Sequence, residues 1–124
     1  MGLKIWLDTG LVDEADAKIS VFDHGVLYGD GVFEGIRVYG GRIFEFDAHI
    51  RRLFESAKVI RLPVPMPREK LVEAVETTVK ANDISDGYIR LIVTRGVGDL
   101  GLNPFICKHS SLIIIASGIQ LYPE

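Results

Sequence analysis

Two helical patterns follow each other directly in the middle of the chain, and this order limits the choice of fold more than any other feature. Apolar side chains recur at helical spacing from Asp47, a good N-cap, to Ile60, and Pro63 ends the run. A second amphipathic stretch runs from Pro67 to about Asn82. β-rich runs lie before and after this pair instead of alternating with helices. The order predicts an α+β domain with a mainly antiparallel sheet and two adjacent helices on one face, not a doubly wound parallel sheet.

Extended runs rich in Val, Ile, Phe and Tyr predict the strands of this sheet. Thr9 and Gly10 separate the first two runs, and the pair Gly40 and Gly41 between the next two suits a primed hairpin turn. A glycine-rich segment, residues 96–104, separates the last two. The expected strands cover residues 4–8, 11–12, 30–39, 42–46, 88–95 and 112–117.

Length and composition exclude several other classes of protein. The 124 residues suit one domain, and 48% hydrophobic with 25% charged residues is ordinary for a soluble globular protein. The 14 basic and 17 acidic side chains form no runs, so nucleic acid is not an expected partner. The longest apolar run, Leu112 to Ala116, is too short for a membrane span. One cysteine, Cys107, and no secretory signal at the start favour the reducing cytoplasm.

No motif for a metal or a nucleotide occurs in the sequence. Cys107 and His109 lack partners at metal-ligand spacing, so we expect no metal site. The segment around His24 contains three glycines, but it lacks the Gly-Lys-Ser/Thr ending of a Walker loop. It also lacks the strand, glycines and helix of a dinucleotide-binding fingerprint. We expect a flexible or tightly turned segment there.

One face of the strand expected at 30–39 has an unusual composition. Because side chains alternate along a strand, Phe33, Gly35 and Arg37 share one side of it. A glycine between a large aromatic ring and an arginine is typical of a place where a ligand or another backbone approaches closely. A bulge near a sheet edge is the structural alternative, and the residues alone leave both readings open. The other face carries Val32, Glu34, Ile36 and Val38.

The strand expected at 88–95 pairs a tyrosine with an arginine in the same way. Tyr88 and Arg90 share a face, and a hydroxyl beside a planar guanidinium can bind a carboxylate. An edge-strand arginine that reaches into solvent is the alternative, and it is the more common case.

Arg52 is the candidate phosphate ligand on the first helix. His49 precedes it by three residues and Ser56 follows it by four, so the three side chains project at similar angles. Arg52 also adjoins the apolar stripe, where a phosphate would be better desolvated than on the open helix face. A merely solvated face is the alternative, for which Arg51 and Glu55 are better candidates, and spacing does not decide between them.

The strings YGDGVFEGIR, HIRRLFESAK, YIRLIVTRG and GLNP, in this order and spacing, resemble the small amino-terminal domain of fold-type IV (class IV) pyridoxal-phosphate-dependent aminotransferases. The resemblance extends from about Ile5 to Ser117 and is greatest to the branched-chain amino acid aminotransferases. It implies the small domain of the D-amino-acid-aminotransferase-like fold for residues 1–118. Residues 119–124 would begin the interdomain linker.

The same resemblance assigns roles to the candidate residues. Arg52 would hold the phosphate of pyridoxal 5'-phosphate. The domain would form a homodimer, or a multiple of dimers, in which Tyr28 and Leu102 enter the substrate pocket of the neighbouring subunit. Either Arg90 or Arg37 would meet the side-chain carboxylate of glutamate or 2-oxoglutarate, and Phe33 would contact aliphatic side chains. The implied substrate-binding residues are Phe33, Gly35, Arg37, Tyr88 and Arg90.

The implied activity is transfer of the amino group between Leu, Ile or Val and 2-oxoglutarate. D-amino acid aminotransferases and aminodeoxychorismate lyases share the fold, but the former carry a tyrosine at the position of Phe33, and both lack the FEGIR string. In this family the cofactor-binding lysine lies in a second, larger domain, so we expect these 124 residues to be inactive alone. A stand-alone module without catalytic activity is the remaining alternative.

Overall fold

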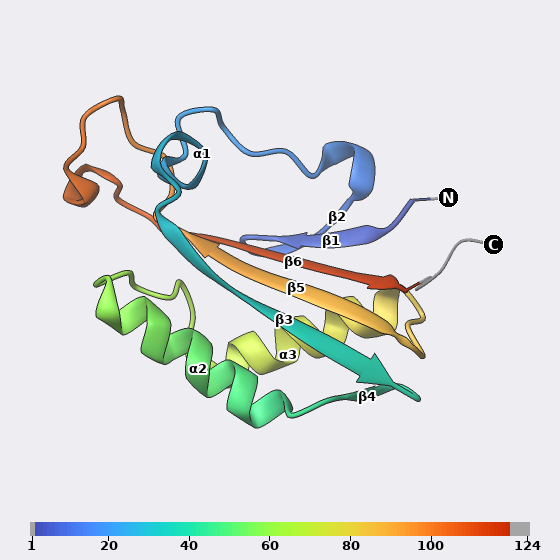
Figure 1. Cartoon of the computed structure of the whole chain (residues 1–124). Coiled ribbons are helices and arrows are strands. Elements are labelled where there is room, and N and C mark those ends of the chain that lie inside the picture. The colour runs from blue at the N-terminus through green and yellow to red at the C-terminus, as the bar shows by residue number, and fades with distance from the viewer. Residues whose placement is uncertain (1, 120–124) are drawn as a thin grey trace.

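The computed structural model of the chain describes residues 2–119 and confirms the expected α+β class. Six antiparallel strands form one sheet in the order β2-β1-β6-β5-β3-β4. Helices α2 (Phe46–Val59) and α3 (Arg68–Ala81) both cover the same face of this sheet (Figure 1). The strands are β1 (Lys4–Leu7), β2 (Gly10–Asp13), β3 (Gly31–Tyr39), β4 (Arg42–Ile43), β5 (Gly87–Thr94) and β6 (Ser111–Gly118).

The core lies between the two helices and the sheet. Apolar stripes of α2 and α3 pack onto alternate residues of the three central strands, as the helical and strand periodicities predict. Within residues 2–119, no such helix pair covers the opposite face of the sheet (Figure 1). Phe33, which alternates along β3 with the buried Glu34 and Ile36, is 59% exposed. The largest fully buried side chains of the core include Ile36, Ile50, Leu53, Leu71, Ile89, Leu91, Leu112 and Ile114.

Helix α2 begins earlier than its sequence predicts. Its N-cap is Glu45, at φ 50°, and not Asp47, which lies in the first turn and pairs with Arg68. Phe46 is therefore helical, and it packs against the core. Burial of this ring outweighs the capping preference of Asp47 and shortens β4 to Arg42–Ile43.

The two hairpin turns differ in how closely they follow expectation. Gly40 and Gly41 have φ values of 56° and 78°, which confirms the primed turn. In the first hairpin, Asp8 instead takes the left-handed conformation, at φ 57°. Its Oδ1 accepts hydrogen bonds from Ser111 Oγ at 2.6 Å and Leu112 N at 3.0 Å. These bonds stabilise a conformation that aspartate tolerates better than most residues.

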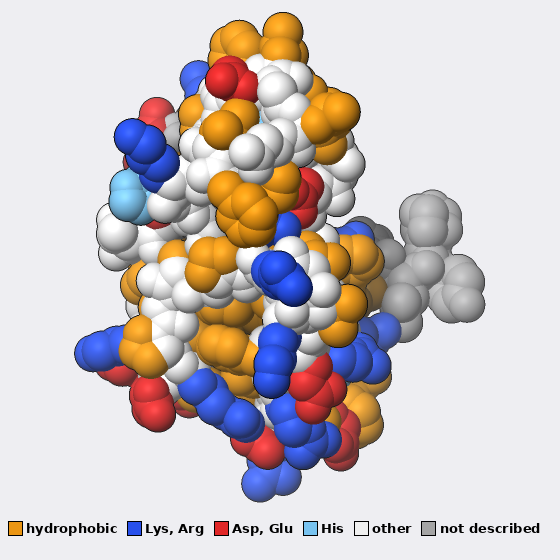
Figure 2. All heavy atoms as spheres, turned by 90° about the vertical axis from the view of Figure 1, so that its left-hand side faces the viewer, with side chains coloured by type: hydrophobic (Ala, Val, Ile, Leu, Met, Phe, Trp, Pro, Cys, Tyr) orange, Lys and Arg blue, Asp and Glu red, His pale blue; other side chains and the backbone are white. Residues whose placement is uncertain are grey.

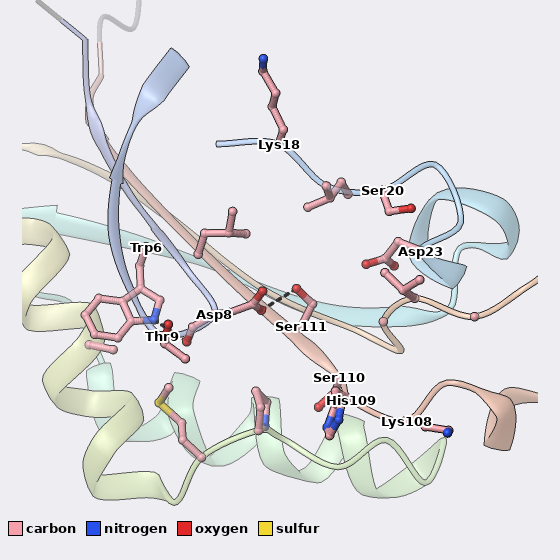
Figure 3. A pocket seen from close by; sticks show the side chains of 18 of the residues that line it. Trp6, Asp8, Thr9, Lys18, Ser20, Asp23, Lys108, His109, Ser110 and Ser111 are labelled. Atoms are coloured by element: carbon pink, nitrogen blue, oxygen red, sulfur yellow. Dashed lines mark hydrogen bonds between the residues drawn. The ribbon is translucent and has the colours of Figure 1, made fainter. Parts of the chain in front are cut away.

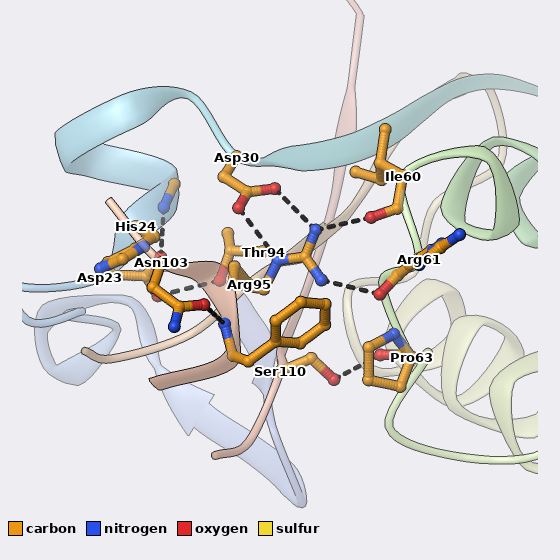
Figure 4. Close-up of polar contacts among 12 residues, drawn as sticks. Asp23, His24, Asp30, Ile60, Arg61, Pro63, Thr94, Arg95, Asn103 and Ser110 are labelled. Atoms are coloured by element: carbon orange, nitrogen blue, oxygen red, sulfur yellow. Dashed lines mark hydrogen bonds and ion pairs between the residues drawn. The ribbon is translucent and has the colours of Figure 1, made fainter. Parts of the chain in front are cut away.

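Arg95 joins three elements at the end of β5. Its side chain is 6% exposed and donates to both carboxylate oxygens of Asp30, at 2.9 and 3.1 Å. It also donates to the carbonyl oxygens of Ile60 and Arg61, each at 2.8 Å (Figure 4). The guanidinium thus fixes the start of β3 and the end of α2, where a positive charge is favourable for the helix dipole.

A short helix, α1 (His24–Tyr28), forms where we expected only a tight or flexible segment. Asp23 caps it by accepting from Gly25 N at 2.7 Å, and its other carboxylate oxygen accepts from Thr94 Oγ1 at 2.9 Å. Two single 3-10 turns, η1 (Glu14–Asp16) and η2 (Pro104–Ile106), complete the secondary structure. Within residues 2–119, none of the helices has the length and apolarity needed to cross a membrane.

Candidate active site

The five candidate residues of β3 and β5 share the open face of the sheet. Alternation predicts the grouping within each strand, and the register of β3 with β5 brings the two groups to the same face. In the antiparallel register Gly35 lies opposite Arg90, and Arg37 lies opposite Tyr88. The β5 side chains lean diagonally along β3. The Tyr88 hydroxyl therefore comes to lie over Gly35, and the Arg90 guanidinium lies over the Phe33 ring, 4.5 Å from its centroid.

A hollow of about 380 Å³ opens beside this row, between the sheet and α1. Phe33 and Arg90 line it together with apolar groups of Val26, Ile92 and Ile113. A cation beside aromatic and aliphatic surface can accept a carboxylate or an aliphatic side chain. Of the five candidates, Gly35, Arg37 and Tyr88 do not line this hollow but continue the row along the strands.

Gly35 has a specific reason to be glycine. A Cβ atom there would overlap the Tyr88 hydroxyl oxygen and lie 3.0 Å from Tyr88 Cζ. We expect Gly35→Ala to lower the free energy of unfolding by about 1–3 kcal/mol, measured by urea denaturation, because the ring must move. Gly10→Ala is the matched control, since nothing lies within 4 Å of a Cβ there. Equal effects of the two substitutions would contradict this account.

Arg52 lies at the outer edge of β3, where it forms an ion pair that sequence reasoning missed. Its Nε donates to Glu34 Oε2 at 2.9 Å and its Nη2 to Glu34 Oε1 at 2.8 Å. His49 Nδ1 lies 2.7 Å from the same Oε1. The Glu34 side chain is only 5% exposed, whereas that of Arg52 is 63% exposed. No hydrogen bond within residues 2–119 engages Nη1 of Arg52, which leaves that nitrogen available to a ligand.

In this cluster, Glu34 and Arg52 each stabilise the charged form of the other. Burial alone would raise the pKa of Glu34, but hydrogen bonds and charges from Arg52 and His49 outweigh it and hold the pKa below its usual value. The same hydrogen bond raises the pKa of Arg52. Glu34 is therefore ionised at neutral pH, and it fixes the orientation of the guanidinium.

A hollow of about 360 Å³ adjoins the cluster and is lined by His49, Arg51 and Arg52, together with Glu45, Glu55 and the apolar Phe44. Glu34 accepts hydrogen bonds from Nε and Nη2 of Arg52, so it does not use the Nη1 side of the guanidinium. Arg52, with a free nitrogen and a guanidinium oriented by Glu34, fits the phosphate group of pyridoxal phosphate, whereas Arg51 in the same hollow faces Glu55. Among the described residues, no lysine lines this hollow or the one on the open face.

A hollow of about 1130 Å³ lies elsewhere and contains none of the predicted site residues. It runs past the turn between β1 and β2 (Figure 3), next to Trp6, Lys18, Lys108 and His109. Two carboxylates on its wall, Asp8 and Asp23, already accept hydrogen bonds from the protein. These two carboxylates therefore stabilise the turn and the start of α1, and we place the site on the hollows that the predicted residues line.

Tyr28 and Leu102 lie at the projecting end of the molecule, which α1 and the loop 96–105 form (Figure 1). Leu102 is 78% exposed, and neither residue lines the hollow that Phe33 and Arg90 of the same chain form. Hydrophobic side chains are numerous over this end, whereas charged side chains gather over the helices (Figure 2). Of the loop glycines Gly96, Gly98 and Gly101, only Gly96 has a positive φ, of 93°.

Glu34 did carry a signal in the sequence. It is the one charged residue among Val32, Ile36 and Val38 on the core-facing side of β3, and a buried charge requires a partner. Arg95 carries the same signal on β5, after Ile89, Leu91 and Val93. His49, expected from the sequence only as a neighbour of Arg52, is the second partner of Glu34.

Within residues 2–119, no cluster of three or more His, Cys, Asp or Glu side chains could hold a metal ion.

Each of the two hollows contains at least one arginine, the residue type best suited to pair with an anionic group. The family model for amino-transferase class IV matches residues 31–124. A putative branched-chain-amino-acid aminotransferase from Methanocaldococcus jannaschii is 53% identical over 114 residues, which are 92% of this chain and 40% of that protein. A D-alanine aminotransferase from Listeria monocytogenes is 41% identical over 95 residues, which are 77% of this chain and 33% of that protein.

A solved structure agrees over nearly the whole chain. The branched-chain aminotransferase from the thermophilic archaeon Thermoproteus uzoniensis, with norvaline, matches with a TM-score of 0.86 at 38% identity, covering 97% of this chain and 42% of that one. The chain belongs to the class IV aminotransferase family. It spans between a third and about two fifths of the length of these relatives.

Proposed function

We propose that this chain is the cofactor-phosphate-binding and substrate-binding domain of a pyridoxal-phosphate-dependent aminotransferase that acts on branched-chain L-amino acids and 2-oxoglutarate. The observation that carries the proposal is Arg90 stacked over Phe33 at the mouth of one hollow. This pair offers a cation to an acidic substrate and an apolar surface to an aliphatic one. The identity to the Methanocaldococcus jannaschii protein supports the same substrate class.

The two hollows have different roles in this proposal: one binds the phosphate of the cofactor and the other binds the substrate. Pyridoxal phosphate, when bound, supplies the electron sink that transfer of an amino group requires. Arg52 holds the phosphate with the donors that Glu34 leaves free, and the ionised Glu34 keeps the guanidinium in place. Phe33, Gly35 and Tyr88 shape the substrate side of β3. We place the lysine that binds the cofactor beyond residue 124, so that residues 1–124 alone are inactive.

The assembly and the domain boundaries belong to the same proposal. Tyr28 and Leu102 complete the substrate pocket of a neighbouring subunit in a homodimer or a multiple of dimers. Residues 1–118 form the small domain, and the linker begins at 119–124, of which 120–124 lie outside the described residues. A cytoplasmic location fits the single cysteine, Cys107.

Arg90 is our candidate for the ligand of the acidic substrate, because it lines the hollow and Arg37 does not. In the complete enzyme we expect Arg90→Leu to raise KM for 2-oxoglutarate about 10- to 100-fold, since a charge-assisted hydrogen bond is lost. KM for 4-methyl-2-oxopentanoate, which has no second carboxylate, should change less than about threefold. Steady-state kinetics with the two 2-oxo acids measures both effects.

Arg37→Leu is the matched control for this substitution. The Arg37 guanidinium stacks on Tyr39, 5.2 Å from the ring centroid, and its Nε is buried without a hydrogen-bond partner within residues 2–119. If Arg37→Leu rather than Arg90→Leu raised KM selectively for 2-oxoglutarate, the assignment of Arg90 would be wrong. Equal increases for both 2-oxo acids with Arg90→Leu would also contradict it.

A D-amino acid aminotransferase is the second candidate, favoured by the 41% identity to the Listeria monocytogenes protein. Initial rates with L-leucine and D-alanine separate the two activities. Turnover of L-leucine without turnover of D-alanine supports the proposal, and the reverse result overturns it.

A further inference from the structure

The residues that lead into α1 pair with the start of the loop 96–105. His24 N donates to Gly96 O at 2.9 Å, and Gly98 N donates to Phe22 O at 3.0 Å. Asp23 and Val97 form the antiparallel bridge between these bonds. The backbone alone therefore fixes the loop only as far as residue 98.

Two side chains of α1 continue this pairing toward the tip of the loop. The His24 side chain is 1% exposed, and its Nε2 lies 2.9 Å from the carbonyl oxygen of Asp99. Because a carbonyl oxygen only accepts, Nε2 must carry a proton. Tyr28 donates its hydroxyl to the next carbonyl oxygen, that of Leu100. The two rings meet edge to face, with centroids 5.0 Å apart at 83°.

Gly98 shows independently that the loop is shaped around the histidine. A Cβ atom at this position would lie 2.8 Å from His24 Nε2 and 2.7 Å from Cys107 Sγ. Real side chains do not approach so closely, so only glycine allows the loop backbone to pass over the imidazole. The dihedral angles of Gly98 are ordinary, so close approach and not conformation requires glycine here.

We propose that His24 is a positioning residue, which holds the loop 96–105 in a fixed register against Tyr28. Leu102 and Phe105, at 78% and 71% exposure, are then presented with Tyr28 as one rigid unit. This inference rests on the proposed function in one respect: the unit is the part of the chain that completes the pocket of the neighbouring subunit. No role in chemistry is assigned to the imidazole itself.

Amide hydrogen exchange of the 124-residue chain tests the positioning directly. His24→Phe keeps a ring beside Tyr28 but removes the donor, and His24→Gln keeps an Nε2 donor but removes the ring. We expect His24→Phe to speed exchange in peptides covering residues 97–103 about tenfold and to leave β5 unchanged. His24→Gln should stay within about twofold of the wild type. Unchanged loop exchange in His24→Phe, or an equal rise in β5, would overturn the proposal.

Gly98→Ala keeps the test decisive if His24→Phe does not fold. This substitution leaves the imidazole in place and pushes the loop away from it, so the same loop-specific rise in exchange is expected. An exchange rate equal to that of the wild type would contradict the proposed register.

Kinetics of the complete enzyme separates this inference from the proposed function. His24→Phe should lower kcat/KM for L-leucine about tenfold and leave the affinity for pyridoxal phosphate within about twofold, since Arg52 lies on α2. Faster loop exchange with unchanged kinetics would leave the positioning role intact and would contradict the role of the loop in the neighbouring pocket.

Discussion

Replacing Arg52 with glutamine is expected to weaken the binding of pyridoxal phosphate to the complete enzyme about 100-fold. Glutamine cannot present a charged fork to the phosphate, and it leaves Glu34, which is only 5% exposed, without its principal partner. The uncompensated carboxylate would then repel a dianionic phosphate. Titration of the apoenzyme with pyridoxal phosphate, followed by absorbance, measures the dissociation constant.

Arg51→Gln is the control for Arg52→Gln, because it removes the same charge one residue away. Arg51 is also exposed, and its Nε lies 3.8 Å from Glu55 in a weak surface pair. Its substitution should change the dissociation constant less than about threefold, because Arg51 is not oriented by Glu34 and Glu55 partly offsets its charge. Equal losses for the two variants would show a general effect of charge and not a specific phosphate ligand.

Replacing Arg95 with leucine is expected to lower the free energy of unfolding by about 3–5 kcal/mol, because it leaves a half-buried carboxylate unpaired. The guanidinium donates to Asp30 and to the carbonyl oxygens of Ile60 and Arg61, and leucine replaces none of these bonds. Urea denaturation of the chain, followed by circular dichroism, measures the loss.

The double variant Arg95→Leu/Asp30→Asn distinguishes the buried charge from the lost packing. Removing the carboxylate charge should recover at least about 1 kcal/mol of the loss, because a neutral amide is less costly to leave unpaired than a carboxylate. A double variant no more stable than Arg95→Leu would show that Asp30 contributes nothing to the penalty. A loss of less than about 1 kcal/mol in the single variant would contradict the role of Arg95 in joining β3, α2 and β5.

Alternation along the strands predicted much of the candidate site. The period of two separated Phe33 from Glu34 on β3 and grouped Arg90 with Tyr88 on β5, in agreement with the burial of these strands. That Phe33 and Arg90 lie on the same face of the sheet follows only from the register of β3 with β5. The diagonal lean of Arg90 over Phe33 could not be predicted, because it depends on side-chain torsions and not on spacing.

The sequence did not predict where helix α2 begins, nor the hydrogen bonds that side chains make to backbone carbonyl groups. The start of α2 depends on burial of Phe46 against a core that only the assembled sheet creates. The contacts of His24 and Tyr28 end on the carbonyl oxygens of Asp99 and Leu100. Every residue has a carbonyl group, so such acceptors leave no trace in the sequence.

In the proposed function, strand β3 contributes to both ligand sites, with Phe33 and Gly35 on its open face and Glu34, the partner of Arg52, on the other. An in-frame insertion of one codon between Val32 and Phe33 would rotate every following side chain to the opposite face or force a bulge. Phenylalanine would then enter the core while the carboxylate turned outward. Single-residue insertions should therefore be far rarer in this strand among natural homologues than conservative substitutions, and they should abolish phosphate and substrate binding together.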